Sequence, residues 1–379
     1  MAQVPDGFLE GNVERYRKLI RGERVEYAPF RLWLDCTFVC EYANVNPKDY
    51  SSDIEVMFEA QKIVNDRFYG LRDFSIDIGN ADIFFDLEKF NEDHPESVPD
   101  RVLEKDLDNF DRYFCTTPIA ETKAAKEITK AIEYFNSRLP DDKKVYHYLG
   151  STGAMDLYSI FRGTEKFFID LYDHPAKVKK IFDFLFQRTL EWIEFTESRW
   201  GNMPANNNLY DKVDIGEDYC AYLPPELFDE FVRPYTGEIF NRYKGKALCS
   251  LHTDGDIIPS GISQLNKLNI DELMGFSPNI DIKDFREALP DVILAGNIHP
   301  INVMIEGTPE DVKNAARYCF ETANQNQKFV LCTGGAISAG AKPENVDAFI
   351  ESTYEIVKYD NQCEDSYDSQ RISNTNVRV

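Results

Sequence analysis

Short apolar segments alternate with much longer segments of helical pattern along the 379-residue chain, and this alternation limits the possible folds most strongly. Strands separated by helices run parallel, either in an open doubly wound sheet or in a closed barrel. Eight such repeats favour a (β/α)8 TIM barrel. The predicted strands, whose length and apolar character suit burial on both faces, are residues 31–36, 74–79, 145–150, 212–216, 247–252, 272–276, 292–297 and 329–335.

The segments between these strands carry recognisable helix starts. Thr308 is followed by Pro309 and two acidic residues, the pattern of an N-cap and a first helical turn. Residues 342–358 repeat this pattern. Residues 170–200 have apolar residues near helical spacing and predict a short helix followed by a long one.

The same patterns divide the chain into three parts. Residues 1–28 are interpreted as an N-terminal extension, and residues 29–359 as the barrel, which forms the catalytic domain. Residues 360–379 form a polar tail with too few apolar residues to bury.

Charge and cysteine content exclude several classes of protein. A formal net charge of -24 argues against binding to nucleic acid or to an anionic membrane surface, because both need basic patches. No apolar run is long enough to span a membrane, and no secretion leader is recognisable at the N-terminus. The 8 scattered cysteines suit reduced thiols better than a disulfide framework, so a cytoplasmic location is expected.

Residues capable of metal binding gather at the predicted strand ends, where TIM-barrel enzymes place their active sites. His252 ends one strand and Asp254 follows it, Glu217 follows another strand, and Cys332 lies in the last. A catalytic zinc ion takes three protein ligands of these types, so His252, Cys332 and either Glu217 or Asp254 would suffice. The alternative is a hydrogen-bonded histidine and a core thiol.

Two further residues after the seventh predicted strand are candidates for catalysis, beside His252 and Glu217. Asn297 and His299 lie in the segment "AGNIHPI". His299 would orient a substrate or donate a proton to a departing oxygen. A histidine before proline in a loop is equally consistent with a turn residue.

Four motifs in a fixed order carry a resemblance to a known family. They are "VDIGEDYCAYLPPELFDEFVRPYTGEIF", "LHTDGD", "AGNIHPINVMIEGTPEDV" and "FVLCTGGAISAGAKPENVDAFI". Together they resemble the uroporphyrinogen decarboxylase superfamily, and the similarity extends over about residues 5–358. The resemblance implies a (β/α)8 barrel.

Members of this superfamily are decarboxylases or zinc-dependent corrinoid methyltransferases, and the motifs favour the second branch. Decarboxylases carry an N-terminal Arg-Gln-Ala-Gly-Arg motif, but the corresponding segment here is "FRLWLDCTFVCEYANVN". The methyltransferases that act on coenzyme M use His-x-Cys and a distant cysteine as zinc ligands. Here the motif is His252-Thr253-Asp254, and Cys332 follows at about the family separation.

The change from thiolate to carboxylate implies a harder Lewis acid, which suits an oxygen better than a thiol. The resemblance therefore implies an O-demethylase component that transfers a methyl group from a small methylated oxygen compound, such as an aryl methyl ether, to Co(I). The chain lacks an Asp-x-His-x-x-Gly cobalamin signature, so the corrinoid is expected on a partner protein. A homodimer is expected by family analogy. The alternatives are a decarboxylase, a methylcobamide:thiol methyltransferase and a non-catalytic binding protein.

Overall fold

Six parallel strands in sequence order form the centre of the molecule. The computed structural model describes residues 4–71, 74–87, 104–147, 149–200, 212–257 and 261–359. Each strand is hydrogen-bonded to the next along the chain, the order expected of a barrel with one helical connection per strand. The strands are β1 (Leu149–Thr152), β2 (Lys212–Gly216), β3 (Leu248–His252), β4 (Glu272–Met274), β5 (Ile293–Ala295) and β6 (Phe329–Val330).

The expected strand at residues 31–36 occupies the place beside β6, although it forms only isolated bridges. Phe30 pairs with Leu331 and Leu34 pairs with Ile337, both in parallel orientation. The expected strand at residues 74–79 joins no ladder within the described residues. This segment bonds to helices instead: Asp77 accepts from Tyr50 of α3 (Pro47–Ser52), and the Ser75 N–H donates to Gln61 Oε1 of α4 (Ile54–Arg67) at 2.9 Å.

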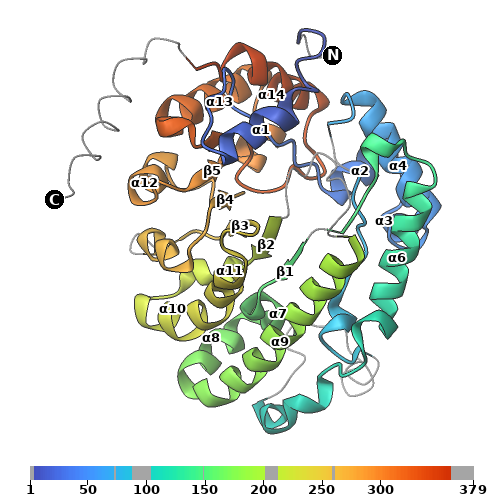
Figure 1. Ribbon diagram of the computed structural model, residues 1–379. Helices are drawn as coiled ribbons and strands as arrows, with labels where there is room; N and C mark the ends of the chain where they lie inside the picture. Colours follow the sequence, from blue (N-terminus) through green and yellow to red (C-terminus); the bar gives the residue numbers. More distant parts are fainter. Residues whose placement is uncertain are drawn as a thin grey trace, which may run out of the picture.

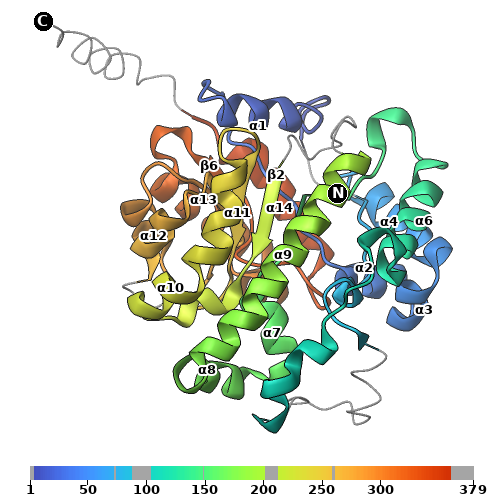
Figure 2. The same ribbon diagram turned by 60° about the horizontal axis from the view of Figure 1, so that its bottom comes forward.

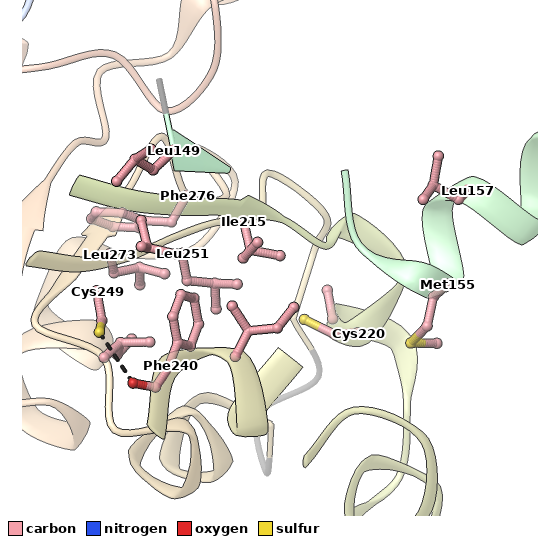
Figure 3. Packing of buried hydrophobic residues seen from close by; sticks show 14 of the residues in the cluster. Leu149, Met155, Leu157, Ile215, Cys220, Phe240, Cys249, Leu251, Leu273 and Phe276 are labelled. Atoms are coloured by element: carbon pink, nitrogen blue, oxygen red, sulfur yellow. Dashed lines mark hydrogen bonds between the residues drawn. The ribbon is translucent and has the colours of Figure 1, made fainter. Parts of the chain in front are cut away.

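Side chains along the strands alternate between two apolar clusters, as the two-residue period of a strand requires. One set, which includes Ile215, Cys249, Leu251 and Leu273, belongs to the large cluster shared with the helices. Figure 3 shows this layer against Phe240, whose carbonyl accepts from Cys249 Sγ at 3.5 Å. The other set faces inward and forms a separate cluster that contains Leu248, Met274, Ile293, Ala295, Val330 and Cys332.

Helices surround the sheet (Figure 1). Those near the chain start are α2 (Cys36–Ala43), α3 (Pro47–Ser52), α4 (Ile54–Arg67) and α6 (Lys123–Asn136), which lie together on one side. The following ones are α7 (Ala154–Arg162), α8 (Thr164–Asp173), α9 (Pro175–Trp200), α10 (Pro225–Phe231), α11 (Glu238–Tyr243), α12 (Ile282–Ala288), α13 (Pro309–Ala323) and α14 (Pro343–Glu355). The short helices that matter for the site are η5 (Asp218–Tyr222) and η8 (Pro300–Ile305).

Local sequence signals placed the helix starts correctly. Thr308 caps α13 in a full capping box, in which its hydroxyl accepts from the Asp311 backbone N–H and the Asp311 carboxylate accepts from the Thr308 N–H. The predicted short and long helices within residues 170–200 are the end of α8 and all of α9. The predicted polar tail at residues 360–379 lies outside the described residues.

The first helix, α1 (Asn12–Ile20), closes one end of the strand assembly. Figure 2 shows it across the end opposite α8 and α10, and therefore at the amino ends of the strands. Tyr16 and Leu19 belong to the inward-facing cluster of the strands. The interior therefore has an apolar floor, and its opposite end, where the strands finish, carries the candidate site.

Candidate metal site

Strands β2 and β3 bring their carboxyl ends to the same level. Gly216 pairs with His252 in the parallel register, and the Glu217 backbone N–H donates to the His252 carbonyl at 3.0 Å. After this pairing the chain turns sharply into η5, which begins at Asp218. The turn directs Asp218 toward the end of β3, while Glu217 lies on the other side.

Asp218, His252 and Asp254 form one group of metal-ligating atoms. Their ligand atoms all lie within 4.8 Å of one another, and His252 Nε2 is 3.8 Å from Asp218 Oδ1. The Asp254 backbone N–H donates to Asp218 Oδ1 at 3.1 Å, which joins the two loops directly. One imidazole and two carboxylates are ligands that zinc accepts, so these three residues could hold the ion.

The imidazole of His252 is held in one orientation. Nδ1 lies 3.0 Å from the Met274 carbonyl, which can only accept, so Nδ1 carries the proton and the lone pair is at Nε2. The ring also lies edge-on to Trp33, with centroids 5.0 Å apart. Gly275, at a φ of +60°, leaves room for this arrangement, because a Cβ there would lie 3.0 Å from His252 Nδ1. A metal-binding histidine normally donates its other N–H to a carbonyl or carboxylate in this way.

Negative charge accumulates around this group. Burial, and then the charge of Asp218, raises the pKa of Asp254. The same two causes raise the pKa of Asp156 to about 7. Carboxylates that raise one another's pKa are stabilised by a bound cation, because the cation removes the repulsion.

The carboxylates of Asp156 and Glu217 join the starts of α7 and η5 by hydrogen bonds in both directions. The Asp156 carboxylate accepts from the Asp218 N–H at 2.9 Å and the Tyr219 N–H at 3.1 Å. Glu217 Oε1 in turn accepts from the Met155 N–H at 3.1 Å and the Asp156 N–H at 3.4 Å. The start of each helix is thus capped by a carboxylate at the start of the other.

Glu217, predicted as a metal ligand and catalytic residue, is therefore directed away from the metal-ligating group. Its second oxygen accepts from Thr236 Oγ1 at 2.9 Å, and burial followed by the charge of Asp156 raises its pKa well above the usual value. Asp218, and not Glu217, lies in the group with His252 and Asp254. The signal was present in the segment "GED", but only the strand register and the turn into η5 decide which acid faces His252.

Cys332, the fourth predicted ligand, also lies outside the group. It is fully buried in the inward-facing cluster with Met274 and Ala295, and burial raises its thiol pKa to about 11. A thiol binds zinc as the thiolate, which this environment disfavours. Of the predicted ligands, the structure brings together His252 and Asp254.

Asn297 and His299, the other predicted catalytic residues, are engaged in local structure after β5. The Asn297 amide donates to the Ser277 carbonyl at 2.8 Å and to the Ile280 carbonyl at 2.9 Å, which ties two loops together. His299 Nδ1 accepts from the Ile301 and Asn302 backbone N–H groups at 3.1 Å, so it caps η8. Burial lowers the His299 pKa, which favours this neutral, accepting form.

A family model described as uroporphyrinogen decarboxylase matches residues 12–356. The chain belongs to the uroporphyrinogen decarboxylase family. This membership agrees with the parallel α/β architecture and with the position of the metal-ligating group at the carboxyl ends of the strands. The expected fold class, a barrel of TIM type, is confirmed, with a described ladder of six strands.

Curated relatives come from both branches of the family. Methylcobamide:CoM methyltransferase MtbA of Methanosarcina acetivorans is 26% identical over 115 residues, which cover 28% of this chain and 33% of the relative. Uroporphyrinogen decarboxylase of Prochlorococcus marinus is 26% identical over 147 residues, which cover 37% and 39%. The matched segments thus span between a third and two fifths of these relatives.

A solved structure, a methyltransferase from Methanosarcina mazei, superimposes with a TM-score of 0.67 at 12% identity. The superposition covers 90% of this chain and 98% of the other, so the two share a fold over nearly their whole length. Among the described residues, no helix is long and apolar enough to cross a membrane.

Proposed function

We propose that the protein is a zinc-dependent methyltransferase that passes a methyl group from a methylated oxygen compound to a separate corrinoid protein. The observation that carries the proposal is the group of Asp218, His252 and Asp254, in which Nε2 of an oriented imidazole faces two carboxylates. The MtbA relatives, whose name includes methylcobamide, support a corrinoid partner.

The ligand types favour an oxygen substrate over a thiol. Asp218, His252 and Asp254 would hold the ion through one nitrogen and two oxygens, which suits a harder Lewis acid than a thiolate set does. When bound, zinc would supply a Lewis acid that stabilises the negative charge developing on the oxygen as the methyl group leaves. An aryl methyl ether is the donor that we favour, because a phenolate is a good leaving group.

The chain's own residues position the reaction. The Met274 carbonyl fixes the His252 ring, and the Asp156 carboxylate fixes the start of η5, so Asp218 and His252 are held on separate rigid elements. Tyr222, 47% exposed, lies at the end of η5 and contacts Phe168 and Tyr219. This aromatic group would shield one side of the site from water and leave the methyl group facing outward.

A cofactor-free decarboxylase is the second candidate, because one curated relative is a uroporphyrinogen decarboxylase and two basic residues, Arg31 and Lys212, line the barrel interior. However, Lys212 is already paired with two carboxylates, at 3.1 and 2.9 Å. A decarboxylase of this kind needs no metal. Metal content therefore separates the two functions.

The test is zinc content by plasma mass spectrometry of the purified protein and of His252→Ala, Asp218→Asn and Cys332→Ala. We expect near-stoichiometric zinc in the wild type and in Cys332→Ala, and loss of most zinc in the other two, because each removes one of about three ligands. Wild-type protein with zinc should then methylate free cob(I)alamin from a methyl ether, followed by its visible absorbance.

Two results would contradict this proposal. A wild type that holds no zinc and cannot be reloaded would leave the decarboxylase as the better function. Loss of zinc in Cys332→Ala together with retention of zinc in Asp218→Asn would show that the Cys332 thiol is a ligand and that Asp218 is not.

A further inference from the structure

The interior of the strand assembly below His252 carries polar side chains from β2, β3 and β4 beside the apolar inward-facing cluster, whereas TIM barrels are usually filled with branched apolar residues. The inward-facing positions of β2 carry Lys212 and Asp214, and those of β3 and β4 carry Ser250 and Glu272. The side chains of Lys212 and Asp214 are largely buried, at 13% and 16% exposed, and the atoms Lys212 Nζ and Asp214 Oδ1 are themselves buried. Polar groups at such a depth point to a ligand that needs them.

Lys212, Ser250 and the two carboxylates pair with one another, although Asp214 Oδ1 and Glu272 Oε1 are buried without a hydrogen-bond partner in the described part of the chain. Lys212 Nζ lies 3.1 Å from Asp214 Oδ2 and 2.9 Å from Glu272 Oε2. Ser250 Oγ donates to the same Glu272 oxygen at 2.9 Å. The ammonium group of Lys212 is therefore already paired with both carboxylates.

Arg31 is the exception. Its guanidinium Nη1 lies 2.7 Å from the Met274 sulfur, and among the described residues no carboxylate lies within 4.0 Å of it. A thioether is a weak acceptor, so the planar fork of N–H donors lacks the bidentate partner that guanidinium groups prefer. The Arg31 charge still acts on Asp214. Burial alone would raise the Asp214 pKa, but the positive charges of Lys212 and then Arg31 outweigh burial, so the Asp214 pKa is lowered.

Met274 contacts both Arg31 and the metal-ligating group. Met274 accepts from His252 Nδ1 with its carbonyl and contacts Arg31 with its sulfur. Trp33, two residues after Arg31, lies against the His252 ring.

We propose that Arg31 binds an anionic group of the methyl donor, a carboxylate held by the guanidinium fork while the methylated oxygen lies at Asp218, His252 and Asp254. The inference rests on the proposed function and narrows its substrate to methyl compounds with a carboxylate. An uncharged methyl ether would leave the guanidinium without a partner. A Lys at this position would keep the charge but lose the fork.

The test is ligand binding without any corrinoid, measured by titration calorimetry on zinc-loaded protein. Two matched pairs serve as probes: 4-methoxybenzoate with 4-methoxybenzamide, and methoxyacetate with methoxyacetamide. At least one carboxylate should bind the wild type about tenfold or more tightly than its amide, because charge-assisted bidentate hydrogen bonds are stronger than neutral ones. Arg31→Gln should abolish this preference, whereas Arg31→Lys should reduce it.

Arg317→Gln is the matched control, since Arg317 is exposed and bonds to Asn314 on the outer helix α13. Equal binding of a carboxylate to wild type and Arg31→Gln would overturn the inference, as would amides that bind as tightly as the carboxylates. If Arg31→Gln does not fold, two other measurements test the inference: the binding constants of Arg31→Lys, and the ratio of carboxylate to amide binding constants in the wild type. Zinc content measured on the same samples shows separately whether the metal proposal fails, because the carboxylate preference does not depend on it.

Discussion

At the residue scale, the site depends on small residues that leave space for charged ones. Gly153 lies directly against the Glu217 carboxylate, and a Cβ at this position would overlap Oε2. Glu217 cannot move aside without losing the Thr236 hydroxyl and the Met155 N–H that satisfy it. A buried carboxylate without such partners costs several kcal/mol.

We therefore expect Gly153→Ala to destabilise the protein by about 2–4 kcal/mol, the cost of overpacking together with a displaced buried carboxylate. Urea denaturation followed by circular dichroism measures this change. Gly79→Ala is the control, because nothing lies within 4 Å of a Cβ there. Equal stability of the two variants would show that Glu217 is free to shift.

At the element scale, η5 owes its position to the cap that α7 provides. Asp156, near the start of α7, accepts from the first two N–H groups of η5, and Asp218 is the first residue of that helix. The carboxylate thereby fixes a proposed ligand without touching the ion itself. Such supporting contacts usually change metal affinity when they are removed.

Asp156→Asn should weaken zinc binding about tenfold or more, because the amide retains only one acceptor oxygen for two N–H donors. Competition with a chelator measures the zinc affinity. Asp281→Asn is a matched control, since Asp281 caps α12 away from the site by accepting from the Lys283 N–H at 3.0 Å. A similar loss of unfolding free energy in both variants, with unchanged zinc affinity in Asp156→Asn, would argue against a positioning role.

At the scale of the whole molecule, α1 completes the interior as a floor opposite the site (Figure 2). Leu19 is 6% exposed and shares the inward-facing cluster with strand residues far away in sequence. Residues 12–20 thus contribute to the barrel core even though the sequence suggested only an extension.

Leu19→Ala should lower the free energy of unfolding by about 2–4 kcal/mol, as for a buried leucine that leaves a cavity. Ile160→Ala, at a residue 61% exposed on α7, should change it by less than about 0.5 kcal/mol. Urea titration of both variants gives the comparison. A small effect of Leu19→Ala would mean that α1 contributes little to the stability of the barrel.

The sequence by itself determined the features that depend on neighbours along the chain. Thr308 and Pro309 start α13 because a cap and a preset φ act within one turn. Six of the eight apolar runs overlap strands, because their composition favours burial. His252 and Asp254 were recognisable for the same reason, since a strand end followed by polar residues is a local pattern.

The tertiary structure alone decided which strand-end residues meet. The β2–β3 register and the turn into η5 bring Asp218 to His252 and send the adjacent Glu217 to the start of α7. Alternation along the last strand places Cys332 in the interior, and residues 74–79 bond to helices α3 and α4. Each outcome depends on partners that are distant in the chain, because a difference of one residue in a strand or turn reverses the direction of a side chain.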